Sequence, residues 1–214
     1  MKTTLIVVRH GYSEGNRDTR FVGHGDVPLT EIGHAQALCT ADYLKGWRID
    51  RIYSSDLCRA MQTAIPVAKM HGLPIYPMEE LREIYAGEWE GGLYAELLEK
   101  YPESYGKWIR DIGNAHPDGG ESVAEMAARV YAAVDRIVQE NEGKCVAIFT
   151  HGTPARVLGC RWHQLPLSKT NELPFCGNAS VSIAEYESDG SWRLIQYGYD
   201  GHQGENATRL PANV

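Results

Sequence analysis

Apolar residues follow two alternating patterns along this chain: short continuous runs, and longer stretches with an apolar residue every three or four positions. The continuous runs, rich in Val, Ile and aromatic residues, predict buried strands. They cover residues 3–9, 48–56, 73–78, 144–150, 178–187 and 191–199. Two prolines in the third run predict an edge strand. The last two runs, separated by Ser188-Asp189-Gly190, predict an antiparallel hairpin.

The stretches with helical spacing predict helices between these strands. One helix is expected to begin at Thr30, a typical N-cap residue, and another to end at Gly72. A third is expected to begin at a capping box formed by Ser122 and Glu125. The apolar face of the Thr30 helix is expected to hold Ile32, Ala35 and Leu38, and that of the Ser122 helix Val123, Met126, Val130, Val134 and Ile137.

The order of these elements predicts an α/β fold. We expect a three-layer α/β/α sandwich around a mostly parallel sheet of about six strands, with one antiparallel edge pairing. Residues 84–120 lose the regular pattern and contain seven glycines, with short helical segments expected around Leu97 and Trp108. Such a segment is typical of an insertion over a site. The 214 residues therefore predict a single domain, 1–214, that carries this insertion.

Composition and charge restrict the classes of function. No apolar run approaches the roughly 18 residues that span a bilayer, and the N-terminal segment lacks the features of a signal peptide, so we expect a cytoplasmic protein. The five cysteines show no paired spacing and are expected to be reduced thiols. A formal net charge of −7 argues against binding to nucleic acid or to a membrane. An anionic ligand must then be held by local positive charge.

Histidines and glycines directly follow two of the predicted strands. The stretch VVRHGYSEGN places Arg9, His10 and Gly11 at the end of the first strand, and His151 and Gly152 follow the run CVAIFT. A solvated strand end would explain either group alone. The carboxyl ends of parallel strands, however, meet at one edge of a sheet, where α/β folds bind their ligands. Two histidines at that edge favour a site.

Arg59 adds a cation at the same edge, because it lies in the first turn of the helix that follows the second strand. A cation is unfavourable at a helix N-terminus unless an anion compensates it, which favours an anion site. The guanidinium of an arginine can bind two phosphoryl oxygens at once. A neutral imidazole can attack phosphorus. The leaving alkoxide then needs an acid. The spacing leaves five candidates open for that acid: Glu79, Glu80, Glu83, Glu88 and Glu90.

The motifs resemble those of the histidine phosphatase superfamily, in the branch that contains cofactor-dependent phosphoglycerate mutases and many monoester phosphatases. The resemblance rests on VVRHGYSEGN, RFVGHGDVPLTEIGHAQA, SSDLCRAMQTA, LREIYAGEWEGG, GGES and FTHGTPARVL, which follow the family's order across essentially the whole chain. It implies a phosphohistidine on His10 and a proton donor at Glu83. The phosphate pocket that it implies consists of Arg9, Arg59, His151 and Asn16. Further substrate-binding residues are expected to be Arg20, Val22, Gly23, Tyr85 and Gly152, with His24 and His116 near the mouth of the site.

The family mechanism needs no metal, and the remaining histidines show no metal-ligand spacing, so we expect neither a metal nor a cofactor here. Mutases of the family carry Arg-His-Tyr after the acid and a basic insertion with paired arginines, whereas this chain has Ile84-Tyr85-Ala86. The bases within 84–120 are Lys100, Lys107 and Arg110, against seven carboxylates. Six aromatic residues of this segment predict a partly apolar substrate surface, with half of them in the insertion's own core: Tyr85, Trp89, Tyr94, Tyr101, Tyr105 and Trp108.

These departures favour a phosphatase over a mutase. We expect a metal-independent phosphomonoester hydrolase that acts on a small phosphorylated metabolite. A cofactor-dependent phosphoglycerate mutase is the first alternative. A catalytically inactive protein that binds a phosphate ligand or serves as a scaffold is the second. A homodimer is left open.

Overall fold

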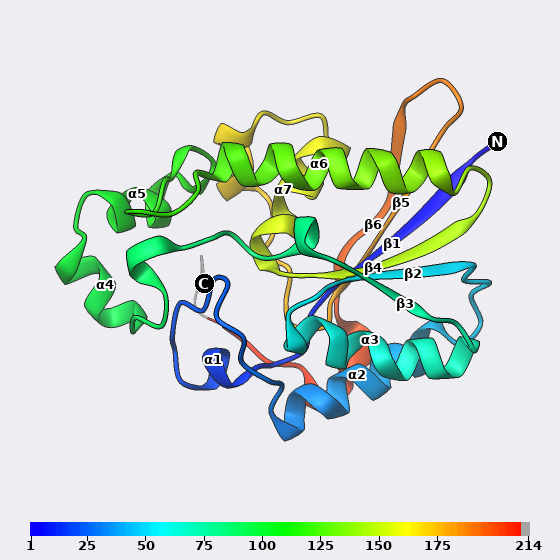
Figure 1. Cartoon of the computed structure of the whole chain (residues 1–214), viewed down its shortest axis with the longest axis horizontal. Helices are drawn as coiled ribbons and strands as arrows, with labels where there is room; N and C mark the ends of the chain where they lie inside the picture. The colour runs from blue at the N-terminus through cyan, green and yellow to red at the C-terminus, as the bar shows by residue number, and fades with distance from the viewer. Residues whose placement is uncertain (211–214) are drawn as a thin grey trace.

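The strands predicted from the continuous apolar runs form one six-stranded sheet (Figure 1). The computed structural model describes residues 1–210; the last four residues of the predicted domain, 211–214, lie outside the described residues. The strands are β1 (Thr3–Arg9), β2 (Arg51–Ser55), β3 (Ile75–Met78), β4 (Cys145–Thr150), β5 (Val181–Tyr186) and β6 (Trp192–Tyr199). Their order is β3-β2-β4-β1-β5-β6, and β3, β2, β4 and β1 pair in parallel.

The predicted hairpin is formed by β5 and β6, and β5 also pairs antiparallel with β1. Strand β5 is therefore antiparallel to both of its neighbours. The predicted fold class, an α/β sandwich with a mostly parallel sheet, is confirmed.

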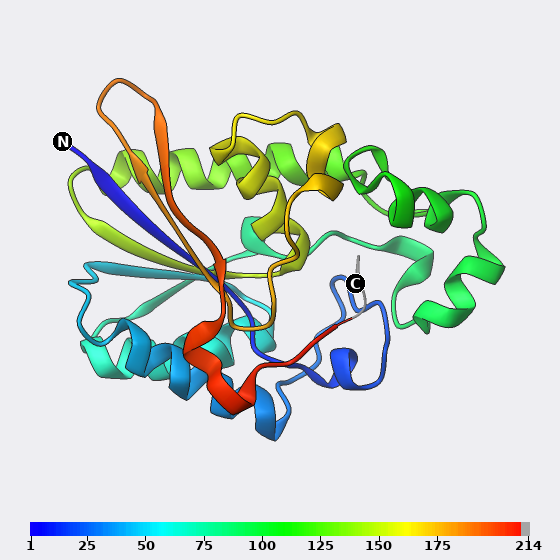
Figure 2. The same cartoon turned by 180° about the vertical axis from the view of Figure 1, so that it is seen from behind.

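Helices cover both faces of the sheet, as Figures 1 and 2 show from opposite sides. One face carries α2 (Glu31–Leu44) and α3 (Cys58–His71), and the other carries α6 (Val123–Glu140) and α7 (Gly152–Trp162). Leu5 and Val7 of β1 pack in the core with α6 and α7, whereas Ile6 and Val8 pack in the core with α2 and α3. Because both faces of β1 are covered, its sequence is a continuous apolar run rather than an alternating one.

The predicted helix ends agree with the structure. Thr30 is the N-cap of α2, and its side chain accepts a hydrogen bond from the backbone N–H of Gly33. Gly72 ends α3 with a φ of 64°. Ser122 and Glu125 form the capping box of α6, whose predicted apolar stripe is buried.

The predicted apolar face of α2 is wrong. Ile32 and Leu38 are 46% and 63% exposed, and the buried face consists of Gly33, Gln36, Ala37, Thr40, Ala41 and Leu44. This face packs against α3 and the 3-10 helix η5 (Gly201–Asn206). Two of its residues are polar and satisfied by hydrogen bonds: Gln36 Oε1 accepts from Tyr12 N (2.7 Å), and Thr40 Oγ1 accepts from Gln203 Nε2 (3.1 Å). Hydrogen bonding at these two positions overrides the apolar pattern.

The segment 84–120 extends from one end of the sandwich, next to the start of α6 (Figure 1). Its elements are η2 (Gly87–Trp89), α4 (Tyr94–Lys100), α5 (Ser104–Arg110) and η3 (Ile112–Asn114). Trp89, Tyr105 and Trp108 are buried and pack edge to face, and Phe21 joins them with ring centroids 5.6 Å from Trp89 and 5.1 Å from Trp108. Half of the aromatic residues of this segment thus form its core, as predicted.

The remaining elements are α1 (Glu14–Arg17), η1 (Glu79–Leu81) and η4 (Leu167–Glu172). None of the helices within residues 1–210 has the length and apolar character that crossing a membrane requires. The five cysteines are free thiols, as the sequence predicts.

Candidate active site

A pocket opens at the carboxyl ends of β1 and β4, the edge of the sheet where the sequence predicts a site. The residues that line it are Arg9, His10, Ser13, Asn16, Arg20, Phe21, Val22, Gly23, Arg59, Glu83, Tyr94, Trp108 and Thr153. Eight predicted site residues are in this set: Arg9, His10, Asn16, Arg20, Val22, Gly23, Arg59 and Glu83. The other three predicted residues, His151, Gly152 and Tyr85, do not line the pocket.

Gly11 allows the loop after β1 to pass directly against α2. A Cβ atom at Gly11 would lie 2.7 Å from the carbonyl oxygen of Gly33, which is too close for any larger residue. The N–H of Gly11 donates to Thr63 Oγ1 of α3 (3.0 Å). The glycine therefore fixes the turn that directs His10 into the pocket.

His10 is buried, with its ring held by its own loop. Nδ1 donates to the carbonyl oxygen of Gly11 (2.7 Å), and because a carbonyl only accepts, Nδ1 carries the proton and Nε2 carries the lone pair. Burial, together with the nearby cations Arg59 and Arg9, lowers the pKa of His10 well below its usual value. The ring is therefore neutral at physiological pH and has a free nucleophilic nitrogen.

Two buried guanidinium groups flank this ring, and their partners are backbone carbonyls. Arg9 Nη1 donates to the carbonyl of Cys176 (2.6 Å), and the guanidinium lies over the ring of Phe175. Arg59 donates to the carbonyls of Gly25 and Gly23 (both 2.8 Å). Burial lowers the pKa of each arginine, and Glu83, in its ionised form, counteracts this by raising it.

Arginine remains charged in such surroundings. Arg9 Nε is buried and has no hydrogen-bond partner within residues 1–210. Neither arginine forms a salt bridge in the described part of the chain, so the pocket holds positive charge that a bound anion would neutralise.

His151 lies behind His10 rather than in the pocket wall. The two ring centroids are 5.2 Å apart, and His151 Nε2 shares a hydrogen bond with Ser55 Oγ of β2 (2.8 Å). Burial, together with Arg59, His10 and Arg9, lowers the pKa of His151 well below its usual value, so this ring is also neutral.

Gly152 leaves space for Arg9 rather than lining the pocket. A Cβ atom at Gly152 would lie 3.3 Å from Arg9 Cζ, which would press against the guanidinium. The glycine at the start of α7 thus allows Arg9 to lie close to the helix backbone.

Asn16 is oriented by donors that occupy its amide oxygen. Asn16 Oδ1 accepts from the backbone N–H and the hydroxyl of Ser13 (3.2 and 3.1 Å) and from Asn178 Nδ2 (3.0 Å). The amide nitrogen is therefore the group that Asn16 can offer to a ligand. Ser13 caps the short helix α1, which explains why this residue, missed by the sequence prediction, lies in the pocket wall.

Glu83 is the one member of the five candidate acids that lines the pocket. Its Oε1 accepts from the backbone N–H of Ile84 (2.9 Å) and its Oε2 from that of Thr153 in the first turn of α7 (3.2 Å). The other candidates have different partners: Glu79 and Glu80 pair with arginines, Glu88 accepts from Tyr101, and Glu90 accepts from the backbone of the loop at residues 24 and 25. The geometry therefore agrees with the implied assignment of Glu83.

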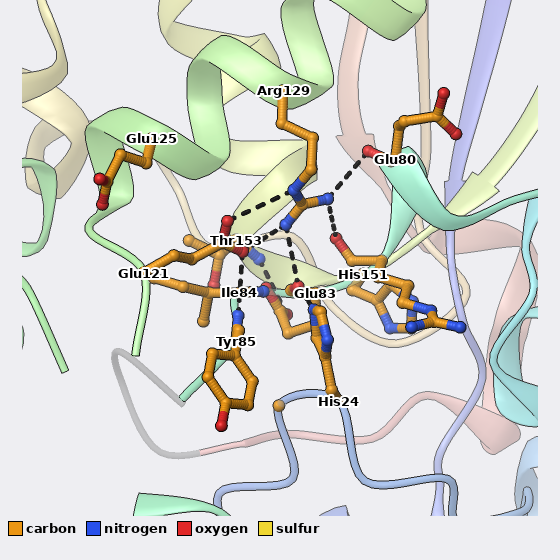
Figure 3. A network of polar contacts seen from close by, with 12 residues as sticks. His24, Glu80, Glu83, Ile84, Tyr85, Glu121, Glu125, Arg129, His151 and Thr153 are labelled. Atoms are coloured by element: carbon orange, nitrogen blue, oxygen red, sulfur yellow. Dashed lines mark hydrogen bonds and ion pairs between the residues drawn. The ribbon is translucent and has the colours of Figure 1, made fainter. Parts of the chain in front are cut away.

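The outer residues differ more from the predictions. Arg20 is exposed at the rim and donates to the carbonyl of Gly91 (2.6 Å). Tyr85 is 45% exposed, and its ring lies tilted against that of His24, with ring centroids 5.4 Å apart. His24 Nε2 donates to the carbonyl of Glu83 (2.9 Å; Figure 3). His116 donates to Gly120. Contacts of Tyr85, His24 and His116 with a substrate stay predictions.

The sequence prediction missed two further lining residues, Phe21 and Thr153. The other two, Tyr94 and Trp108, are among the aromatic residues predicted to form a partly apolar substrate surface. Phe21 and the tryptophan belong to the core of the segment 84–120, so the same side chains stabilise that segment and form the wall. Thr153 contributes its backbone N–H, for which the residue type gives no signal. Within residues 1–210, no group of three or more His, Cys, Asp or Glu side chains is arranged to hold a metal ion.

The chain matches one family of known proteins along nearly its whole length. The family model described as the histidine phosphatase superfamily (branch 1) matches residues 5–200. Phosphoserine phosphatase 1 of Hydrogenobacter thermophilus is 34% identical over 183 residues, or 86% of this chain and 86% of that protein. Glucosyl-3-phosphoglycerate phosphatase of Mycobacterium tuberculosis is 31% identical over 205 residues, or 89% of this chain and 92% of that protein. The solved structure of Bacillus stearothermophilus YhfR is 32% identical, has a TM-score of 0.90, and the match covers 94% of this chain and 99% of that chain.

The lowered pKa values of His10 and His151 predict that both rings stay neutral as the pH falls from 7 to 6. In the unfolded chain the same residues have pKa values of about 6.5. Below that pH the unfolded state binds protons that the folded state does not, so the free energy of unfolding should fall as the pH decreases. Nitrogen-15 NMR of the imidazoles checks this, and His10 should appear as the Nδ1–H tautomer. A cationic His10 at pH 6 in the folded, ligand-free protein would contradict the assignment.

Proposed function

Because this chain belongs to the histidine phosphatase superfamily (branch 1) and is a phosphatase, we propose that it hydrolyses small phosphate monoesters through a covalent intermediate on His10. The observation that carries the proposal is the arrangement of a neutral imidazole, with Nε2 free, between two buried guanidiniums that have no salt-bridge partner among residues 1–210. A phosphoryl group fits these guanidiniums because its oxygens accept paired hydrogen bonds and neutralise both charges.

In the first step, the Nε2 lone pair of His10 attacks phosphorus and the bond from phosphorus to the ester oxygen breaks. The charge on the phosphoryl oxygens is balanced by Arg9 and Arg59. Glu83 gives its proton to the leaving oxygen, so an alcohol departs rather than an alkoxide. The hydrogen bond from Nδ1 to the carbonyl of Gly11 keeps the ring oriented while Nε2 acquires the phosphoryl group.

In the second step, water replaces the departed alcohol and attacks the phosphohistidine. The carboxylate of Glu83 takes a proton from that water, the bond between phosphorus and Nε2 breaks, and inorganic phosphate is released. His10 regains its lone pair and Glu83 its proton, so the enzyme returns to its starting state. This cycle needs no metal ion.

The substrate class is a small phosphorylated metabolite. Relatives named as phosphatases of phosphoserine and of glucosyl-3-phosphoglycerate support this class, since both named substrates are phosphate monoesters of small polar molecules. The part of the pocket beyond Arg9 and Arg59 offers aromatic surface from Tyr94 and Trp108 together with the cation of Arg20. These groups would contact the part of the substrate that does not react.

The charge of the segment 84–120 supports hydrolysis over the mutase alternative. A mutase must hold a second phosphate of its bisphosphate cofactor, which needs cations at the mouth of the site. Lys100, Lys107 and Arg110 do not line the pocket, and Lys100 lies instead over the ring of Tyr101. A bisphosphate would therefore find no cation from this segment to neutralise it.

Replacement of the proposed acid should have an effect that depends on the leaving group. In Glu83→Gln, turnover of an alkyl phosphate should fall by about 10²- to 10⁴-fold, because general acid catalysis contributes on that scale. The burst of nitrophenol released from p-nitrophenyl phosphate in the first step should be affected much less, because nitrophenolate leaves without a proton, although the later hydrolysis of the phosphohistidine still needs Glu83. Rapid-quench kinetics with both substrates measures the difference, and Glu80→Gln serves as a control. Equal slowing for the two leaving groups would show that the proton comes from elsewhere.

Hydrolysis should exceed phosphoryl transfer when both are possible. With 3-phosphoglycerate and 2,3-bisphosphoglycerate in the presence of EDTA, we expect inorganic phosphate to form faster than 2-phosphoglycerate. Product analysis by NMR follows both reactions at once. Faster formation of 2-phosphoglycerate would establish the mutase alternative. Loss of activity in EDTA, if a divalent cation restores it, would refute the metal-independent mechanism.

A further inference from the structure

The backbone that carries Glu83 has an unusual set of hydrogen-bond partners. Residues 80–85 comprise the end of η1 and the four residues after it, and they pair with none of the described strands, so a β-ladder cannot satisfy their peptide groups. Side chains take that role instead (Figure 3). Buried peptide groups need such partners, since an unpaired one costs free energy.

Arg129 of α6 holds three of these peptide groups at once. Its Nη1 donates to the carbonyls of Glu80 (2.9 Å) and Arg82 (3.2 Å), and its Nη2 donates to the carbonyl of Glu83 (3.2 Å). The planar fork of a guanidinium suits this task, because its donors point in several fixed directions. One side chain thus fixes the path of the chain up to Glu83.

Glu121 completes the arrangement on the other side of Glu83. Its carboxylate pairs with Arg129 and accepts from the backbone N–H of Tyr85 (2.9 Å), while its own N–H donates to the carbonyl of Tyr85 (2.9 Å). The ion pair is largely sheltered, with 23% and 20% of the two side chains exposed. Arg129 and Glu121 together hold the chain immediately before and immediately after the proposed acid.

The carboxyl of Glu83 is held partly by this backbone and partly by the start of α7. Its two oxygens accept from the N–H groups of Ile84 and Thr153. Its distance from a leaving oxygen is therefore set jointly by α7, through Thr153, and by α6, through Arg129. Arg129 itself does not line the pocket, so it acts on the reaction through the position of Glu83.

We propose that Arg129, oriented by Glu121, is a positioning residue that sets the proton-transfer geometry of Glu83. This inference rests on the proposed function, in which Glu83 protonates the leaving group. A displacement of the acid by about 1 Å is sufficient to cost a large factor in rate. The binding of phosphate, which depends on Arg9 and Arg59, is not touched by Arg129.

Arg129→Lys separates positioning from simple stabilisation. Lysine keeps the positive charge and the ion pair with Glu121, but a single ammonium cannot donate to three carbonyls in the geometry of the fork. We expect turnover of an alkyl phosphate to fall roughly 10- to 100-fold, with little change in the rate of the nitrophenol burst that accompanies the first step with p-nitrophenyl phosphate. Affinity for inorganic phosphate should be unchanged. Glu121→Gln, which keeps an acceptor for Tyr85 but loses the ion pair, should show the same dependence on the leaving group.

Arg136→Gln is the matched control. Arg136 also lies on α6 and also reaches the 80–85 segment, through the carboxylate of Glu80 (2.7 Å), but it does not contact the backbone around Glu83. Its replacement should leave the ratio of the two substrate rates unchanged. A double variant, Arg129→Lys with Glu83→Gln, completes a cycle: if Arg129 acts through Glu83, the double variant should be no slower than Glu83→Gln alone.

The outcomes distinguish this inference from the proposed function. If Glu83→Gln shows the leaving-group dependence but Arg129→Lys and Glu121→Gln slow both substrates equally or not at all, the positioning role of Arg129 is refuted while the role of Glu83 stands. If the losses from Arg129→Lys and Glu83→Gln are additive, Arg129 acts by another route and the inference is also refuted. If Glu83→Gln itself shows no such dependence, both the acid assignment and the role of Arg129 fail.

Discussion

The site depends on two buried guanidinium groups whose hydrogen-bond partners are neutral carbonyls. A carboxylate in a direct salt bridge with Arg9 or Arg59 would neutralise the charge and would also repel a phosphate. Carbonyls orient the guanidiniums without cancelling their charge, so the positive potential stays available to a ligand. The same potential, together with burial, keeps His10 neutral and hence nucleophilic. In the proposed mechanism, one arrangement of charge thus serves both binding and chemistry.

The fold supplies these carbonyls from loops that are distant in sequence. Arg9 uses the carbonyl of Cys176, just before β5, whereas Arg59 uses carbonyls of Gly23 and Gly25. The loop that holds the two glycines is itself fixed by Glu90, which accepts from the backbone N–H groups at residues 24 and 25 (2.7 and 2.8 Å). The segment 84–120 therefore contributes to the phosphate pocket indirectly, because its carboxylate stabilises the loop that orients an arginine.

Sequence patterns predicted the parts of the structure that follow from burial and from position at strand ends. The strands of the sheet were predicted because both of its faces are covered, and the convergence of Arg9, His10 and Arg59 follows from parallel strands that share one edge. The face of α2 was predicted wrongly because Gln36 and Thr40 are buried through hydrogen bonds, which an apolar pattern does not register. The contribution of Thr153 was missed for a related reason. Thr153 contacts Glu83 through its backbone N–H, which every residue type except proline carries, so the residue type does not indicate this contact.

In the proposed mechanism, His10 attacks phosphorus through Nε2 because its Nδ1–H is held by the carbonyl of Gly11. The most direct test of this mechanism is to trap the phosphorylated enzyme by rapid quenching during turnover of p-nitrophenyl phosphate, and to identify the modified atom by mass spectrometry and phosphorus NMR of the histidine peptide. We expect a single phosphohistidine at His10, linked through Nε2. A phosphoryl group on Nδ1 of His10, or on any other residue, would contradict it.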